Sequence, residues 1–175
     1  MLLRYGGLAI LFDAPPDLGV EDLPVRPRAI FLTDRDSDFV RSARRMASAL
    51  GIPLEASGRL AEPIVIEPYR VVHTRTHPTY GYRIRGKRTV VYAPEFYRFP
   101  RRLVAGANVA ILDGATWGRN VRFAREAGGH KDAAQSARLA RALNVGRVYL
   151  THVGKRTEAH GPDSLKVRDG QRLRL

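Results

Sequence analysis

Short apolar runs and one stretch of helical periodicity make up the first third of the chain. Residues 8–12 (LAILF) and 29–32 (AIFL) are compact apolar runs, which are typical of buried strands. Over residues 39–50 the apolar positions recur at helical spacing, and Gly51 and Pro53 then end the pattern. This part of the chain therefore predicts two buried strands followed by a helix.

The middle of the chain alternates like a strand meander. Gly86 and Lys87 separate two of its apolar runs as a hairpin turn would. The runs that we interpret as strands are residues 64–66, 70–73, 80–84 and 89–92.

A strand, a helix and a strand follow, at residues 109–112, 132–143 and 147–151. Asp132 is suited to cap the helix, and Gln135 lies three residues further on. The tail, residues 165–175, alternates around Asp169 and Gly170 and predicts a hairpin. Helices flanked by short buried strands indicate a layered α/β domain with helices on the sheet faces. The strand meander does not suit a regular βαβ array.

Length and composition narrow the classes of protein further. The 175 residues suit one domain spanning residues 1–175. The absence of cysteine excludes a disulfide scaffold, a thiolate zinc site and a cysteine nucleophile, and it fits a cytoplasmic protein. The longest nearly apolar run, residues 103–112, is about half of a membrane span. The first residues carry no export signal, so we expect no membrane association.

The charge balance is strongly basic. Thirty Lys and Arg against 17 Asp and Glu give a formal charge of +13, and the isoelectric point is about 10.9. One interpretation of this charge is a general compositional bias of the source organism. The other is a polyanionic partner, because arginine pairs with phosphate through two parallel hydrogen bonds. The basic residues are spread along the chain, so folding would have to assemble any patch.

Acidic and imidazole side chains follow several predicted strands. Asp34, Asp36 and Asp38 come directly after the second strand, where they could cap the next helix or bind a hard cation. His73 and His152 each end a strand, and His130 follows a glycine pair. Strand ends that meet at one edge of a sheet are where α/β folds build their sites. The pattern predicts a polar site at such an edge.

Taken in order, several segments resemble the metallo-β-lactamase fold superfamily, and more closely its RNase Z-like and cyclic-phosphate phosphodiesterase branch. The order along the chain is the main evidence. The similar segments are residues 2–18 (LLRYGGLAILFDAPPDL), 31–57 (FLTDRDSDFVRSARRMASALGIPLEAS), 73–84 (HTRTHPTYGYRI), 90–96 (VVYAPEF), 110–117 (AILDGATW), 128–156 (GGHKDAAQSARLARALNVGRVYLTHVGKR) and 164–175 (SLKVRDGQRLRL).

The resemblance implies an α/β, four-layer αββα sandwich, shortened at its N-terminus. It also implies a metal site, with Asp38 and His130 in catalysis and His130 protonating the leaving group. His73 corresponds to the strand histidine, and His77 is the alternative. The implied metal ligands are Asp34, Asp36, Asp38, His73, Glu95 and His152.

The chain departs from the family's His-x-His-x-Asp-His motif. The first, second and last histidines of that motif fall on Asp34, Asp36 and Phe39, and the bridging aspartate falls on Glu95. An oxygen-rich donor set favours Mg²⁺, Mn²⁺ or Ca²⁺ over Zn²⁺. One interpretation is a rebuilt site for a divalent metal (Mn, Mg or Zn). The other is loss of the metal, since Phe39 cannot bind one.

Three functions remain open on the sequence alone. The first is a metal-dependent hydrolase of phosphodiesters or other anionic esters. The second is a non-catalytic module that binds nucleic acid or another polyanion through Arg98, Arg101 and Arg102, with the aromatic residues Tyr92, Phe96 and Tyr97 beside them. The third is a partner subunit, because a missing first strand would leave a sheet edge open and favour a homodimer.

Overall fold

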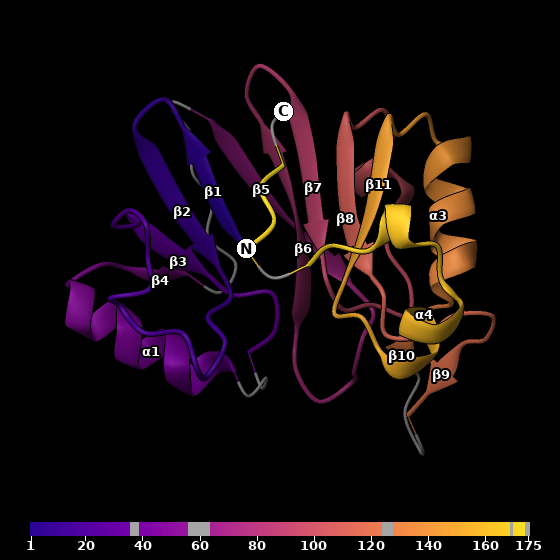
Figure 1. The fold of residues 1–175 in the computed structure, drawn as a ribbon, viewed down its shortest axis with the longest axis horizontal. Helices are drawn as coiled ribbons and strands as arrows, with labels where there is room; N and C mark the ends of the chain where they lie inside the picture. The colour runs from indigo at the N-terminus through magenta and orange to yellow at the C-terminus, as the bar shows by residue number, and fades with distance from the viewer. Residues whose placement is uncertain (36–38, 56–63, 124–127, 169, 174–175) are drawn as a thin grey trace.

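The computed structural model describes residues 1–35, 39–55, 64–123, 128–168 and 170–173, and it arranges them in four layers (Figure 1). Two sheets face each other at the centre. A helix covers the outer face of each sheet, α1 on one side and α3 on the other. The structure therefore has the layered α/β architecture that the sequence pattern predicted, in the αββα form that the resemblance implied.

The first sheet has the strand order β1-β2-β3-β4. Strands β1 and β2 form a hairpin, and β2, β3 and β4 run parallel. Helix α1 (Phe39–Leu50) buries Ala43, Met46 and Leu50 against the outer face of this sheet, as its periodicity predicted. The strand bounds are Leu2–Tyr5, Leu8–Phe12, Ala29–Phe31 and Leu54–Glu55.

The second sheet has the order β11-β8-β7-β6-β5. Strands β11, β8 and β7 are parallel, whereas β6 is antiparallel to both β7 and β5. Strands β5, β7, β8 and β11 therefore all point in one direction and end at the same edge. The strand bounds, from β5 to β8 and then β11, are Val65–Val71, Thr79–Arg85, Thr89–Ala93, Val109–Asp113 and Arg147–Thr151.

Shorter elements complete the fold around this edge. Strands β9 (Val121–Arg122) and β10 (Gly129–His130) pair with each other, and helices α2 (Arg101–Val104) and α4 (Lys155–His160) flank the second sheet. Helix α3 (Ala133–Ala142) begins after Asp132, whose carboxylate accepts a hydrogen bond from the Ala134 amide. The predicted N-cap is thus confirmed.

Aromatic residues fill the space between the sheets. Phe12 lies 5.5 Å from Phe31, 5.3 Å from Tyr82 and 5.7 Å from Tyr92 between ring centroids. The buried Tyr82 hydroxyl donates to the Leu32 carbonyl of the opposite sheet at 2.7 Å. This contact fixes the end of β3, and hence the residues that follow it, relative to β6.

The fold corrects one sequence prediction. Residues 64–66 and 70–73 are not separate strands, since Val65–Val71 is one edge strand and its polar Glu67 forms an ion pair with Arg85 of β6. The predicted tail hairpin around Asp169 and Gly170 falls partly outside the described residues, which omit Asp169 and residues 174–175. In the described part, a short 3-10 turn at Asp163–Leu165 precedes a bridge from Lys166 to Leu150, and the Gln171 amide donates to the Arg168 carbonyl at 3.0 Å as in a turn, but the described residues on either side of that turn form no paired strands.

Among the described residues, no helix has the length and apolar character to cross a bilayer.

Candidate metal and proton-transfer site

The polar site lies at the edge where four strands of the second sheet end. His73 follows β5, Glu95 follows β7, Asp113 closes β8 and His152 follows β11. Asp34 reaches the same place from β3 of the first sheet, through a bridge to Thr79. Because these strands share one direction, their carboxyl ends bring together residues that are distant in sequence, as the sequence analysis expected.

One cluster consists of Asp34, His73 and Glu95. The His73 Nε2 atom lies 3.9 Å from Asp34 Oδ2 and 3.8 Å from Glu95 Oε2. Each residue offers one ligand atom, and these three atoms lie within 4.8 Å of one another. The His73 Nδ1–H donates to the Gly129 carbonyl at 3.1 Å. The Nε2 lone pair therefore faces the two carboxylates and is available to a cation.

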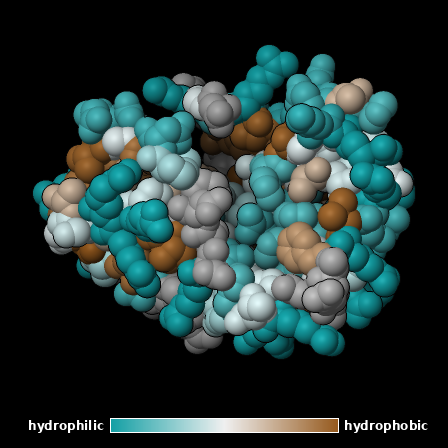
Figure 2. Space-filling model, turned by 90° about the horizontal axis from the view of Figure 1, so that it is seen from below, coloured by the Kyte–Doolittle hydropathy of each residue, from teal (hydrophilic) through white to brown (hydrophobic). Residues whose placement is uncertain are grey.

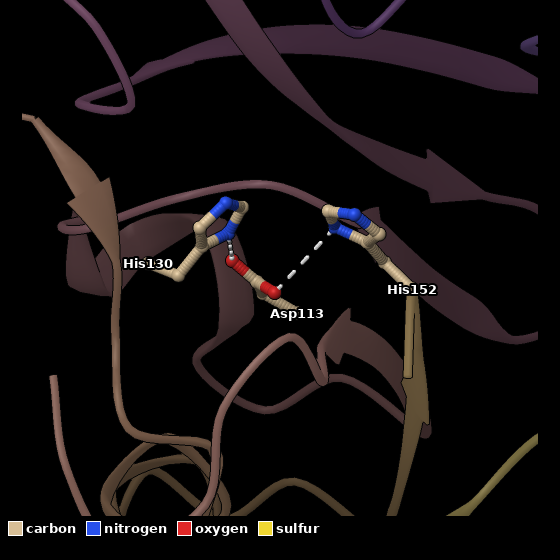
Figure 3. Close-up of side chains that lie close together, drawn as sticks. All are labelled: Asp113, His130 and His152. Atoms are coloured by element: carbon tan, nitrogen blue, oxygen red, sulfur yellow. Dashed lines mark hydrogen bonds and ion pairs between the residues drawn. The ribbon is translucent and has the colours of Figure 1, made fainter. Parts of the chain in front are cut away.

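A second cluster consists of Asp113, His130 and His152 (Figure 3). Asp113 is fully buried and accepts hydrogen bonds from the amides of Phe96 at 3.1 Å and Ala115 at 2.9 Å. Its Oδ2 also lies 2.8 Å from His130 Nδ1, whereas His152 Nδ1 is 3.9 Å from Oδ1. With three partners already in place, Asp113 is suited to orient His130 more than to bind a metal.

Glu95 lies between the two clusters. Its Oε2 faces His73, and its Oε1 lies 3.8 Å from His152 Nδ1. Burial, and then the nearby charges of Asp34, Asp13 and Asp113, raises the pKa of Glu95 to about 8. A carboxylate in this position gains from a neighbouring cation, which would relieve both the desolvation and the repulsion.

The histidines have opposite pKa shifts. Burial, together with the neighbouring charge of His130, lowers the pKa of His73, which keeps its ring neutral. For His130, burial acts in the lowering direction, but the hydrogen bond and charge of Asp113 outweigh it and raise the pKa. The neutral ring is the form that binds metals, and the protonated ring is the form that donates a proton.

The backbone around His130 is packed against His73. A Cβ on Gly128 would lie 1.8 Å from the His73 carbonyl oxygen, and the Gly129 amide donates to that same oxygen at 2.7 Å. The ring of Phe123 contacts both imidazoles, with centroids 5.2 Å from His73 and 5.6 Å from His130. Glycine at position 128 thus allows β10 to approach β5 closely enough to join the two clusters.

The surface is open at this end of the molecule. Figure 2 shows the face on which β9 and β10 lie, and it is hollowed between the half formed by the first sheet and the half formed by the second. The side chain of His152 is 44% exposed. Of the residues in the two clusters, His152 is therefore the most accessible from solution, whereas the side chains of Asp34 and His73 are 4% and 10% exposed.

The structure places the other predicted site residues as follows. Asp36 and Asp38 lie outside the described residues. His77, the alternative strand histidine, lies beside the cluster, with its Nε2 atom 2.6 Å from Asp34 Oδ1. Arg98, Arg101 and Arg102 are exposed. Among the described residues these three arginines form no hydrogen bond or ion pair with the two clusters.

Sequence reasoning missed Asp113. The signal was present, because the aspartate ends the strand VAILD and follows four apolar residues. A buried carboxylate at a strand end needs partners, and it finds them in two amides and an imidazole. The aromatic residues near the arginines also have a different role from the one expected. Tyr92, Phe96 and Tyr97 are buried, so their rings pack inside the protein and do not stack on bases.

Comparison with known proteins shows the family and the fold. Residues 41–153 match the family model of the beta-lactamase superfamily domain. No curated protein matches the chain.

Three similar solved structures show the fold. A diphosphatase of the PhnP family has a TM-score of 0.66 and 17% identity, covering 95% of this chain and 79% of that one. The metallo-beta-lactamase fold protein YhfI from Bacillus subtilis has a TM-score of 0.64 and 18% identity, covering 87% and 77%. An isothiocyanate hydrolase from Delia radicum gut bacteria has a TM-score of 0.59 and 11% identity, covering 95% and 91%.

The family match spans more than half of the chain, the similar folds include a metallo-beta-lactamase fold protein, and the two clusters lie where the strand ends meet. The chain belongs to the metallo-β-lactamase superfamily.

Proposed function

We propose that this protein is a metal-dependent hydrolase of phosphodiesters or related anionic esters. The observation that carries the proposal is that two side-chain clusters with different chemistry lie next to each other. A carboxylate–imidazole cluster of Asp34, His73 and Glu95 lies beside an imidazole, His130, that a buried carboxylate orients. The first suits a cation and the second suits proton transfer.

The donor set of the first cluster fits a divalent cation. Two carboxylates and one neutral imidazole offer oxygen and nitrogen atoms within 4.8 Å of one another. Carboxylate oxygens suit Mg²⁺ and Mn²⁺, and imidazole suits Mn²⁺ and Zn²⁺. Asp34, His73 and Glu95 would hold the ion, with His152 next to Glu95. When bound, the cation supplies a Lewis acid for the ester and an activated water.

His130 is suited to be the general acid. Asp113 engages its Nδ1 atom, so Nε2 is the atom that carries the transferable proton. The raised pKa of His130 favours the protonated ring, which is the form that donates a proton. A hydrolase that cleaves an ester must protonate the leaving oxygen, and a positioned imidazole contributes about 10²–10⁴-fold to such a step.

The anionic nature of the substrate rests on charge and on a similar structure. The chain carries a formal charge of +13, which favours the approach of anions. One of the similar solved structures is a diphosphatase, so phosphate chemistry is found on this fold.

Metal loading tests the proposed function. After chelation and desalting, we expect the protein to bind Mn²⁺, Mg²⁺ or Zn²⁺ and to hydrolyse bis(p-nitrophenyl) phosphate only when loaded. At an ion concentration a hundred times the Kd, binding should stabilise the fold by about 2.7 kcal/mol, which thermal unfolding can measure.

Matched variants distinguish metal binding and turnover at the site from effects elsewhere on the surface. Replacing Asp34 by Asn and His73 by Gln together should abolish both binding and turnover. His160→Gln, at the exposed end of α4, should change neither. An untreated protein without metal, and a reloaded protein without turnover, would exclude a metal-dependent hydrolase.

A second candidate function, the binding of nucleic acid or another polyanion, is favoured by the arginines near α2. The guanidinium of Arg102 lies 5.5 Å from the Tyr69 ring centroid, and those of Arg98 and Arg122 lie 5.8 and 5.5 Å from that of Tyr97. Among the described residues none of these arginines forms an ion pair. Guanidinium groups held on rings in this way are pre-oriented for phosphate.

Retention on single-stranded RNA tests this second function. We expect the affinity to fall steeply with salt, and Arg98→Gln with Arg102→Gln to reduce the dependence of log affinity on log salt by about one unit for each lost phosphate contact. No retention even at low salt would remove this candidate.

A further inference from the structure

We propose that His77 is a positioning residue of the metal site, which holds Asp34 so that its other carboxylate oxygen faces the cation. This inference rests on the proposed function, since Asp34 is one of the residues expected to bind the ion. It assigns a specific role to a side chain of the β5–β6 connection, at the edge of the site.

The two oxygens of Asp34 face different partners. Oδ1 lies 2.6 Å from His77 Nε2, which is the shortest contact between charged or polar side chains described at this site. Oδ2 accepts from the Thr79 hydroxyl at 3.4 Å and lies 3.9 Å from His73 Nε2. Because Oδ1 contacts His77, Oδ2 is the oxygen of Asp34 that faces the metal-binding cluster.

The contacts of the His77 ring favour the tautomer that carries its proton on Nε2. A contact of Nε2 with a carboxylate oxygen requires a proton on Nε2. In the neutral ring Nδ1 then has a lone pair, and it lies 2.9 Å from the Thr76 hydroxyl, which can donate to it. Thr76 is itself fixed by Thr74, whose hydroxyl lies 3.0 Å from that of Thr76 and accepts from the Thr76 amide at 3.3 Å.

His77 is placed to orient the ligand and not to bind the ion. Among the described residues, the group whose ligand atoms lie within 4.8 Å of one another is Asp34, His73 and Glu95, without His77. The Nε2 atom of His77 is already occupied by its contact with Asp34. A ring nitrogen that donates a hydrogen bond has no lone pair for a metal.

The roles of the imidazole and the carboxylate here are the reverse of those in most metal sites. In most metal sites a histidine binds the ion and a carboxylate accepts its second N–H, and removal of that partner weakens metal binding about 10–100-fold. Here the carboxylate of Asp34 takes the place of a motif histidine, and the imidazole of His77 becomes the supporting group. A short carboxylate side chain in place of an imidazole needs such a donor to fix its orientation.

Mn²⁺ titration of the full chain, followed by the electron paramagnetic resonance of free ion, tests the role. We expect His77→Ala to weaken Mn²⁺ binding about 10–100-fold. His77→Gln, which can still donate an N–H to Asp34, should restore part of the affinity. Thr76→Val, which removes the hydroxyl that sets the tautomer, should weaken binding less than His77→Ala. His160→Ala is the matched control and should bind as the parent does.

A second measurement needs no metal. In the metal-free parent, ¹⁵N spectra of the imidazole groups should show His77 with its proton on Nε2, and Asp34→Asn should change that signal. A ring that carries its proton on Nδ1 would overturn the proposal. So would Mn²⁺ binding by His77→Ala within twofold of the parent, and the proposed function would then stand. A parent chain that binds no ion while His77 shows the expected tautomer would instead refute the proposed function.

Discussion

Metal-free Glu95→Gln protein is expected to unfold at a higher temperature than the parent chain at pH 8. The pKa of Glu95 is raised to about 8 by burial and by the charges of Asp34, Asp13 and Asp113. A glutamate carboxyl group in the unfolded chain has its ordinary pKa of about 4.5. Between these two values the folded protein holds a proton that the unfolded chain has released.

The sign of the effect follows from proton linkage. Where the folded state binds more protons, the free energy of unfolding falls as pH rises, by at most about 1.4 kcal/mol per pH unit for one group. The contribution of Glu95 is thus favourable below pH 4.5 and is lost as pH rises toward 8. A neutral glutamine does not titrate, so we expect it to stabilise the metal-free protein at pH 8 by about 1–3 kcal/mol, or several degrees in Tm.

Thermal unfolding in chelator from pH 6.5 to 8.5 measures this difference. The stability of the parent should fall with pH more steeply than that of Glu95→Gln, whereas Glu21→Gln, a change on an exposed loop, should follow the parent. Equal slopes for parent and variant would show that Glu95 titrates as an ordinary exposed carboxyl group. The variant should also lose Mn²⁺ binding, so a gain in stability would accompany a loss of function.

The second large effect is expected at the pair of Asp113 and His130. His130→Ala should lower kcat for a phosphodiester by about 10²–10⁴-fold. KM should change little, because the group acts in the transition state. The loss should be larger for a diester with an alkyl leaving group than for one with p-nitrophenolate, which departs without a proton.

Asp113→Asn tests the orienting carboxylate through the pH profile. Removal of the negative charge should lower the pKa of His130, and the alkaline limb of kcat should move to lower pH. Because Asp113 is proposed to act through His130, the double variant should be no slower than His130→Ala alone. The fold should lose about 1–3 kcal/mol, since an amide cannot accept from every donor that the carboxylate satisfies. If His130→Ala were within threefold of the parent for both leaving groups, His130 would not be the acid.

Much of this site could be anticipated from strand ends alone. The runs that end before Asp34, Glu95 and His152 are apolar and short, and both properties predict buried strands. The superfamily resemblance then indicated which residues would meet. Periodicity also predicted α1 and α3 near their observed bounds, because each helix buries one face against a sheet.

The remainder depended on contacts that no local pattern reveals. Strands β9 and β10 have two residues each, too few for a period to emerge, yet β10 carries His130. The alternation of the tail did not indicate that Lys166, before the predicted turn, would pair with Leu150 of the edge strand β11. The roles of His77 and Asp113 also depend on distant partners. His77 contacts Asp34, which lies 43 positions away in the sequence, and Asp113 contacts His130, which lies 17 positions away.

The close approach at Gly128 has a consequence for engineering of the protein. Backbone atoms join the strand of His130 to the carbonyl of His73, and on the other side of that strand Val121 is paired with His130 in the β9–β10 ladder. New substrate contacts could be introduced by changing the Val121 side chain, whereas the Arg122 side chain is already held by the Tyr97 hydroxyl. A methyl group at position 128 would separate the acid from the ion site.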